Sequence, residues 1–142
     1  MIKSFRGLLS NGAPETTIRL STKDGLTGYR INKFELMPEV YGTGDQVSLV
    51  KVNSVAGIAT TTSMNFTESS LLAAGVVRVG NLLTENMTTS IIFDNVTINQ
   101  DIFITMRNID AALGVNYHLE LEQVKLDLSE ATVATLKDMR AN

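Results

Sequence analysis

The last fifth of the chain, residues 116–142, constrains the fold most, because its pattern passes from strand to helix without a gap. Up to Glu122, apolar and polar side chains alternate, which is typical of a strand with one buried and one solvent-facing side. The alternation then continues in the opposite phase over residues 124–128. A period of two changes phase only where a residue is added, so the pattern predicts a β-bulge near Glu122–Gln123.

A short C-terminal helix is predicted over residues 129–140. Ser129 is the expected N-cap, and Glu130 places a negative charge in the first turn, where the helix dipole favours it. The large apolar side chains of this segment, Val133, Leu136 and Met139, fall three residues apart. Such a stripe suits packing on the chain's own domain or on a neighbouring subunit, and the sequence leaves both open.

The rest of the chain reads as short strands separated by turn residues, about eight in all with the final one. Residues 28–37 repeat the phase change at Asn32–Lys33, which predicts a second bulged strand beside the first. Residues 1–15 suit either a loose N-terminal arm or an edge segment, and Glu68–Ala74 suits either a short helix or a turn. The predicted fold is all-β, a single β-sandwich domain spanning 1–142, with a jelly roll as the favoured form.

Composition excludes several classes of function. The formal net charge is −3, whereas nucleic-acid binders usually carry a basic excess, so we expect no nucleic-acid partner. There is no cysteine, which rules out disulfides and thiolate chemistry. No apolar run is long enough to cross a bilayer and no secretion signal is visible, so we expect a soluble protein made in the cytoplasm without a membrane partner.

His118 is the only histidine, and it alternates on the predicted strand with Glu120 and Glu122. These residues suggest a general base, a carboxylate pair or a metal site. However, no serine elbow accompanies His118, and side chains two apart on a strand lie about 6.5 Å from one another, too far to converge on one ion. We therefore predict no catalytic residue, no metal and no cofactor, and interpret the row as solvated or as a subunit contact.

A second oxygen-rich segment contains Asp94, Asn95, Asn99 and Asp101. These side chains are chemically suited to calcium, but their spacing does not match an EF-hand loop. Turn capping is the favoured interpretation, because Asn and Asp side chains commonly bind nearby backbone in turns.

Two stretches resemble a known class of proteins. The residues SIIFDNVTINQDIFITM and NYHLELEQVKLDLSEATVATLKDMR, and more loosely GYRINKFELM, are similar to small virion proteins of marine tailed bacteriophages. The resemblance covers the last third of the chain closely and residues 28–37 loosely. It implies a decoration or cement protein on the capsid exterior, with the major capsid protein as partner and a homotrimer as the usual arrangement.

Two other functions remain open at the level of sequence. One is a tail- or fibre-associated β-sandwich module, with a glycan as a conceivable ligand; the other is a small metal-dependent hydrolase built on His118. For the decoration role, the candidate subunit-contact residues are His118, Glu120, Glu122, Val133, Leu136 and Met139.

Overall fold

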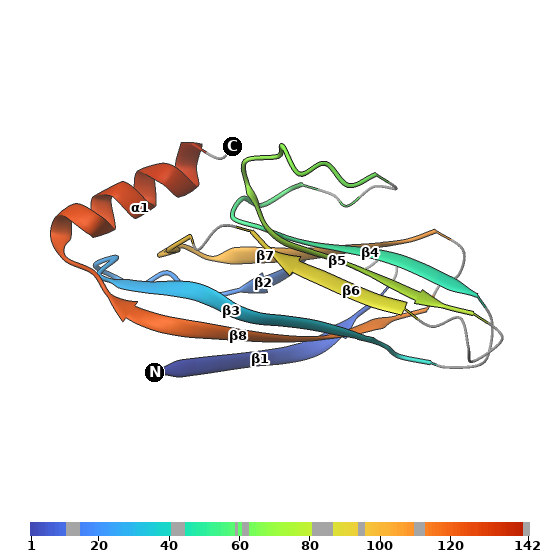
Figure 1. The fold of residues 1–142 in the computed structure, drawn as a ribbon. Coiled ribbons are helices and arrows are strands. Elements are labelled where there is room, and N and C mark those ends of the chain that lie inside the picture. Colours follow the sequence, from blue (N-terminus) through green and yellow to red (C-terminus); the bar gives the residue numbers. More distant parts are fainter. Residues whose placement is uncertain are drawn as a thin grey trace.

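The computed structural model describes residues 1–10, 15–40, 45–58, 60, 63–80, 87–93, 96–109 and 113–140, with helix side chains as far as Leu136. This part of the chain forms eight strands and a C-terminal helix (Figure 1). In chain order they are β1 (Ile2–Leu9), β2 (Thr16–Ile18), β3 (Thr27–Pro38), β4 (Gln46–Asn53), β5 (Leu71–Val79), β6 (Met87–Ile92), β7 (Ile102–Asn108), β8 (Val115–Lys125) and α1 (Leu128–Arg140).

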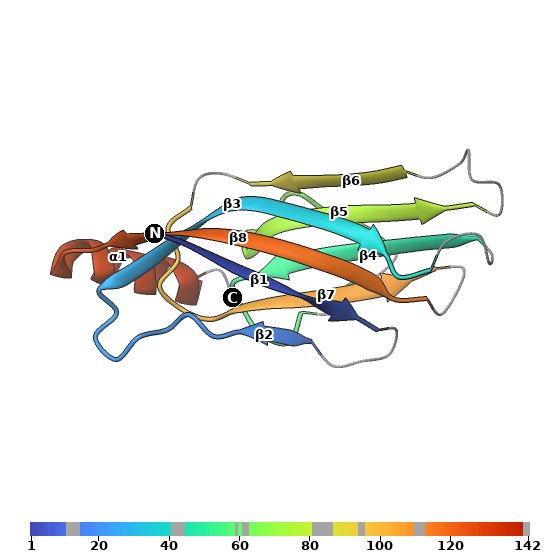
Figure 2. The ribbon, with the colours of Figure 1, turned by 90° about the horizontal axis from the view of Figure 1, so that it is seen from below.

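The strands make two antiparallel sheets that pack face to face. The small sheet has the order β1-β8-β3, and the large sheet has the order β2-β7-β4-β5-β6. Seen from below, the two sets of strands run in roughly the same direction, as in an aligned sandwich (Figure 2). The predicted all-β sandwich with a C-terminal helix is therefore confirmed. Within the described residues, no helix reaches the length and apolarity needed to cross a bilayer.

The jelly-roll form stays a prediction. A regular eight-stranded jelly roll divides into two sheets of four, whereas here β6 pairs with β5 and makes the division three and five. The strand nevertheless lies against the small sheet, because the Ser90 hydroxyl donates a hydrogen bond to the Phe34 carbonyl of β3 at 2.6 Å.

The core lies between the sheets and consists of aliphatic and aromatic side chains from both. The most completely buried of these are Val50, Val52, Ala73, Val77, Ile98, Ile102, Ile104, Val115, Leu119 and Leu121. Gly75 in β5 lets the sheets approach, since a Cβ there would lie 2.4 Å from Leu36 Cδ1. The alternating apolar residues of the sequence therefore form one continuous core.

The bulge predicted at Asn32–Lys33 is confirmed. Ile31 faces Leu121 of β8 and Lys33 faces Glu120, so Asn32 is the extra residue in β3. The added residue changes the parity of the buried side chains of β3, which are Tyr29, Ile31, Phe34 and Leu36. All four side chains can therefore point into the core beside β8, whose inward side chains alternate without interruption.

The second predicted bulge, near Glu122–Gln123, is wrong. β8 stays in register with β3 through this region, as Tyr29 faces Gln123 and Gly28 faces Val124. The apparent phase change arises because a polar residue, Gln123, takes an inner position. Val124 lies on the outer side, where it lines a groove beside α1. The expected pairing of the two strands is confirmed, but only β3 is bulged.

Two ambiguous segments are also resolved. Residues Ile2–Leu9 form the edge strand β1, paired with β8 along its whole length, and not a loose arm. The helical alternative for Glu68–Ala74 is wrong: a turn, in which the Leu71 N–H bonds the Glu68 carbonyl at 3.2 Å, leads directly into β5. Leu71, Leu72 and the β-branched Val77 and Val79 are buried, and this burial favours the strand.

Candidate interaction surfaces

The predicted row of His118, Glu120 and Glu122 lies on the outer face of the small sheet. β8 is its middle strand, so each of these side chains is flanked by β1 and β3 and is half-buried. His118 lies opposite Arg6 on one side and Glu35 on the other. The His118 side chain therefore lies between a cationic and an anionic side chain, and neither cross-strand partner is a serine, threonine or other hydroxyl nucleophile.

The two carboxylates of the row face cations. Glu120 is the cross-strand partner of Lys33, and Glu122 is the partner of Arg30. Lys33 also forms an exposed ion pair with Glu35 at 3.5 Å. Opposite charges in register stabilise a sheet, and the outer face is close to neutral as a result. Among the described residues, no group of three His, Asp or Glu side chains is placed to hold a metal ion.

One end of this face is hollowed into an open depression of about 600 Å³. It is lined by Arg6, Gly7, Leu8, Glu35, Leu36, Met37, Asn116, Tyr117 and His118. The polar groups are mixed in sign, and the one aromatic side chain, Tyr117, is turned into the core. Its burial raises the pKa of the Tyr117 hydroxyl. The depression therefore offers neither a concentrated charge nor an exposed aromatic platform for a sugar.

Helix α1 begins at Leu128, one residue before the predicted range, and the prediction of Ser129 as its N-cap is wrong. The Glu130 N–H donates to Asp127 Oδ1 at 2.8 Å, while Glu130 Oε1 lies 3.5 Å from the Asp127 N–H. This reciprocal arrangement is a capping box with Asp127 as the N-cap. The hydrogen bond from the Glu130 backbone N–H lowers the pKa of the Asp127 carboxyl below its ordinary value.

α1 packs on its own domain through small side chains. Ala131 and Ala134 are buried, and the fully buried Asn99 reaches the helix from the segment before β7. Asn99 Nδ2 lies 3.1 Å from the Ala131 carbonyl, 2.8 Å from Thr135 Oγ1 and 3.2 Å from the Gly25 carbonyl. One amide group thus joins the helix to the turn that precedes β3.

The large apolar side chains of α1 face the solvent. Leu128 is 75% exposed, Val133 is 63% exposed and Leu136 is 47% exposed. We call these three residues the α1 ridge. Met139, the third member of the predicted stripe, has a side chain outside the described residues. The usual pattern of a surface helix, with large apolar residues inward and small or polar residues outward, is reversed here.

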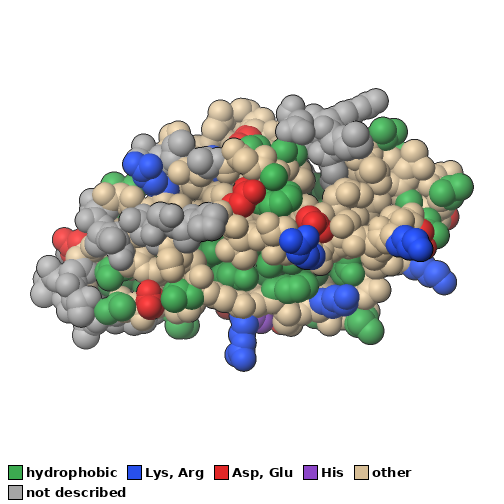
Figure 3. Space-filling model, turned by 180° about the vertical axis from the view of Figure 1, so that it is seen from behind, with side chains coloured by type: hydrophobic (Ala, Val, Ile, Leu, Met, Phe, Trp, Pro, Cys, Tyr) green, Lys and Arg blue, Asp and Glu red, His purple; other side chains and the backbone are tan. Residues whose placement is uncertain are grey.

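The outer face of the large sheet contains a second apolar surface, which the sequence-based prediction missed. On one half of this face, cross-strand neighbours combine aliphatic side chains with two exposed arginines. We call it the arginine face; its residues are Val47, Leu49, Val76, Arg78, Met87, Thr89, Arg107 and Ile109. Figure 3 views the sandwich from the back, along its edge, where exposed hydrophobic side chains lie among polar and charged ones. The signal in the sequence was that β4 is apolar on both parities.

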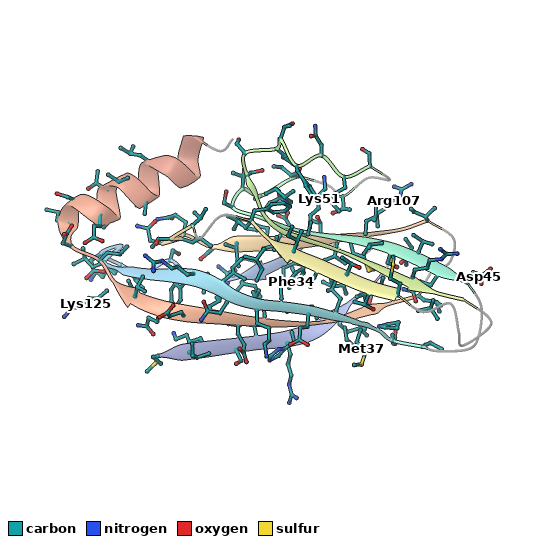
Figure 4. All side chains as sticks on the ribbon, viewed as in Figure 1. Phe34, Met37, Asp45, Lys51, Arg107 and Lys125 are labelled. Atoms are coloured by element: carbon teal, nitrogen blue, oxygen red, sulfur yellow. The ribbon has the colours of Figure 1, made fainter. Side chains whose placement is uncertain are left out.

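The other half of that outer face is covered by the segment between β4 and β5. Lys51 of β4, labelled in Figure 4, points into this cover and forms an ion pair with Glu68 at 3.2 Å. Its side chain is only 7% exposed. The Thr60 and Thr105 hydroxyls lie 2.5 Å apart, and the Phe66 ring packs edge-on against Phe93 at 4.6 Å. Specific contacts therefore hold the segment between β4 and β5 on the sheet, and this segment leaves the arginine face exposed.

The oxygen-rich segment proposed for calcium has another role where it is described. Asp101 Oδ1 accepts hydrogen bonds from the Leu20 N–H at 2.8 Å and the Ser21 N–H at 2.9 Å. Partial burial raises the pKa of Asp101, but these bonds, the Ser21 hydroxyl and the charge of Arg19 outweigh it and leave the pKa lowered. Asn99 serves α1, and Asp94 and Asn95 lie outside the described residues.

Fold and surfaces together define a cysteine-free β-sandwich with apolar outer surfaces, a class of structure and not yet a function. Comparison of the chain with protein-family models and with curated proteins finds no match to either. The resemblance to phage virion proteins thus stays a prediction.

Proposed function

We propose that the protein is a structural component of a bacteriophage particle, a decoration protein that binds the outer surface of the capsid through the major capsid protein. The observation that carries this proposal is the reversed arrangement of α1. Large apolar side chains held in water lower solubility without stabilising the monomer, and a contiguous exposed group of them is typical of a surface that another protein covers.

Further features support an assembly role. The arginine face combines aliphatic side chains with two guanidinium groups, a mixture enriched in protein interfaces. The row of His118, Glu120 and Glu122 is balanced by cations on β3, so it suits a polar contact at the rim of an interface. The residues similar to phage virion proteins include most of β7, β8 and α1.

The proposal is tested on purified particles. Immunogold labelling of intact virions should place the protein on the capsid, with a copy number proportional to that of the major capsid protein. A protein absent from purified virions would contradict the proposal. A few copies per particle, labelled at the tail, would indicate the tail- or fibre-associated alternative instead.

The role of α1 is tested by a truncation after Leu128, which removes the helix but keeps β8. Because the helix buries mainly Ala131 and Ala134, we expect a folded sandwich that no longer joins the capsid. The point variant Leu136→Ser should weaken capsid binding, and Thr132→Ser, at an exposed polar position of the same helix, is its matched control. Unfolding of the truncated chain, with normal binding by Leu136→Ser, would show that the helix serves the domain alone.

A further inference from the structure

The α1 ridge and the arginine face are complementary in chemistry. The ridge consists of Leu128, Val133 and Leu136, and Asp127 and Glu130 supply two exposed carboxylates at its start. The arginine face has aliphatic side chains at its centre and the guanidinium groups of Arg78 and Arg107 beside them. An apolar contact flanked by carboxylate–guanidinium pairs therefore fits both surfaces.

We propose that the α1 ridge of one copy docks on the arginine face of a second copy, in a head-to-tail contact. The register of the large sheet places the apolar and cationic groups side by side. Leu49 lies between Arg107 and Val76, and Val47 is the partner of Arg78. A helix lying across these strands would meet aliphatic side chains first and have a guanidinium group within reach of its first turn.

One copy cannot make this contact with itself. α1 follows Lys125 at one end of the sandwich, whereas Asp45 and Arg107 lie toward the other end (Figure 4). Lys125 is itself a cation near the start of the helix, and Asp45, at the edge of the arginine face, has interactions of its own. We therefore expect the charged pairs across the contact to join Asp127 and Glu130 of one copy to Arg78 and Arg107 of the other, and not to involve Lys125 or Asp45.

A symmetric pairing of two arginine faces is disfavoured. It would bring the guanidinium groups of Arg78 and Arg107 against their own copies, and like charges brought together across an interface cost binding energy. A contact between two different surfaces is heterologous, and it closes into a ring or continues as an open chain. The α1 ridge then joins neighbouring copies on the particle, and under the proposed function it strengthens capsid binding through avidity and not through a direct contact with the capsid.

The contact is expected to be weak in solution. α1 has 13 residues and is about 20 Å long, so it covers less area than a standard interface requires. Copies held side by side on a common support would associate more strongly, because their effective concentration is higher. Free protein should therefore associate in a concentration-dependent way.

Sedimentation velocity on the free full-length protein tests the contact. Wild-type protein should move from monomer to oligomer as its concentration rises. A ridge variant, Leu128→Ser with Leu136→Ser, and a face variant, Arg78→Glu with Arg107→Glu, should each remain monomeric. Arg6→Glu with Lys33→Glu, at two exposed positions on the outer face of the small sheet, reverses the same number of charges, so it is the matched control and should associate as the wild type does. Circular dichroism checks that every variant is folded.

Mixing the two variants gives the decisive result. The face variant keeps an intact ridge and the ridge variant keeps an intact face, so the mixture should form a one-to-one dimer that cannot grow. A wild type that stays monomeric throughout would overturn the inference. So would a face variant that associates normally while the ridge variant does not, because that result indicates helix-to-helix pairing. The assay needs no particles, so its failure leaves the proposed capsid role standing, and the reverse also holds.

Discussion

Replacement of Asn99 by alanine should detach α1 from the sandwich at a predictable cost. The Asn99 amide donates two hydrogens among the Gly25 carbonyl, the Ala131 carbonyl and Thr135 Oγ1. Two net hydrogen bonds contribute about 2 kcal/mol, and the Gly25 carbonyl left without its donor adds about 1 to 2 kcal/mol. The Ala131 carbonyl keeps the Thr135 hydroxyl, at 2.9 Å, and adds little.

One term opposes this loss. Asn99 Oδ1 is buried and has no hydrogen-bond partner in the described part of the protein, so its removal returns about 1 kcal/mol. The sum is a decrease of about 2 to 3 kcal/mol in the free energy of unfolding. Asn99→Asp should be worse near neutral pH, because it turns a carboxylate toward two carbonyl oxygens. Burial beside those oxygens should raise the pKa of the new carboxyl, so the extra loss should shrink as pH falls and the group is protonated.

Urea unfolding followed by circular dichroism measures these differences, and hydrogen exchange of the α1 amides shows whether the helix opens first. Asn116→Ala is the matched control, because Asn116 is exposed on β8, and it should change the free energy of unfolding by less than about 0.5 kcal/mol. An Asn99→Ala protein as stable as this control, with unchanged exchange in α1, would refute the assignment of Asn99 as the helix anchor.

Three further changes test the packing and the charges. Gly75→Ala should cost about 1 to 3 kcal/mol because its Cβ meets Leu36, and adding Leu36→Ala should reduce the combined cost below the sum of the single costs in urea unfolding. The pKa of the Asp101 carboxyl is lowered in the folded protein, so its contribution to the free energy of unfolding is complete above its unfolded pKa of about 3.9 and is lost as the pH falls through the folded value. Asp101→Asn should therefore flatten the dependence of stability on pH over that acidic range. An unchanged pH dependence would contradict this prediction. Glu68→Gln should cost about 3 kcal/mol by leaving buried Lys51 unpaired, and the double change with Lys51→Met should regain most of it; an additive loss in thermal unfolding would contradict the pairing.

The sequence predicted the features that depend on local pattern. Alternation located most strands, and the phase change at Asn32 correctly identified the bulge in β3. The same argument failed at Gln123, because that polar side chain takes an inner position and its Oε1 is buried without a partner in the described residues. Pattern analysis assumes that polar residues face water, so it mistakes such an exception for a change of phase.

The candidate surfaces were predicted less completely, because they depend on neighbours distant in sequence. His118, Glu120 and Glu122 were correctly placed on one outer face, but their cationic partners come from the pairing of β8 with β3. The arginine face combines residues from β4, β5, β6 and β7, and no local pattern joins them. Asp127 was overlooked as the N-cap because it was assigned to the strand, although the reciprocal spacing to Glu130 is visible in the sequence.

The apolar stripe of α1 faces outward because the sandwich has no room for large side chains beneath the helix. Its core is filled by side chains from both sheets, and the surface left for the helix is met by Asn99, which must come within hydrogen-bond distance of the helix backbone. Only side chains as small as Ala131 and Ala134 allow that approach. Val133 and Leu136 are therefore turned outward by the anchor itself, and the apolar area they expose is available to another protein without any rearrangement of the domain.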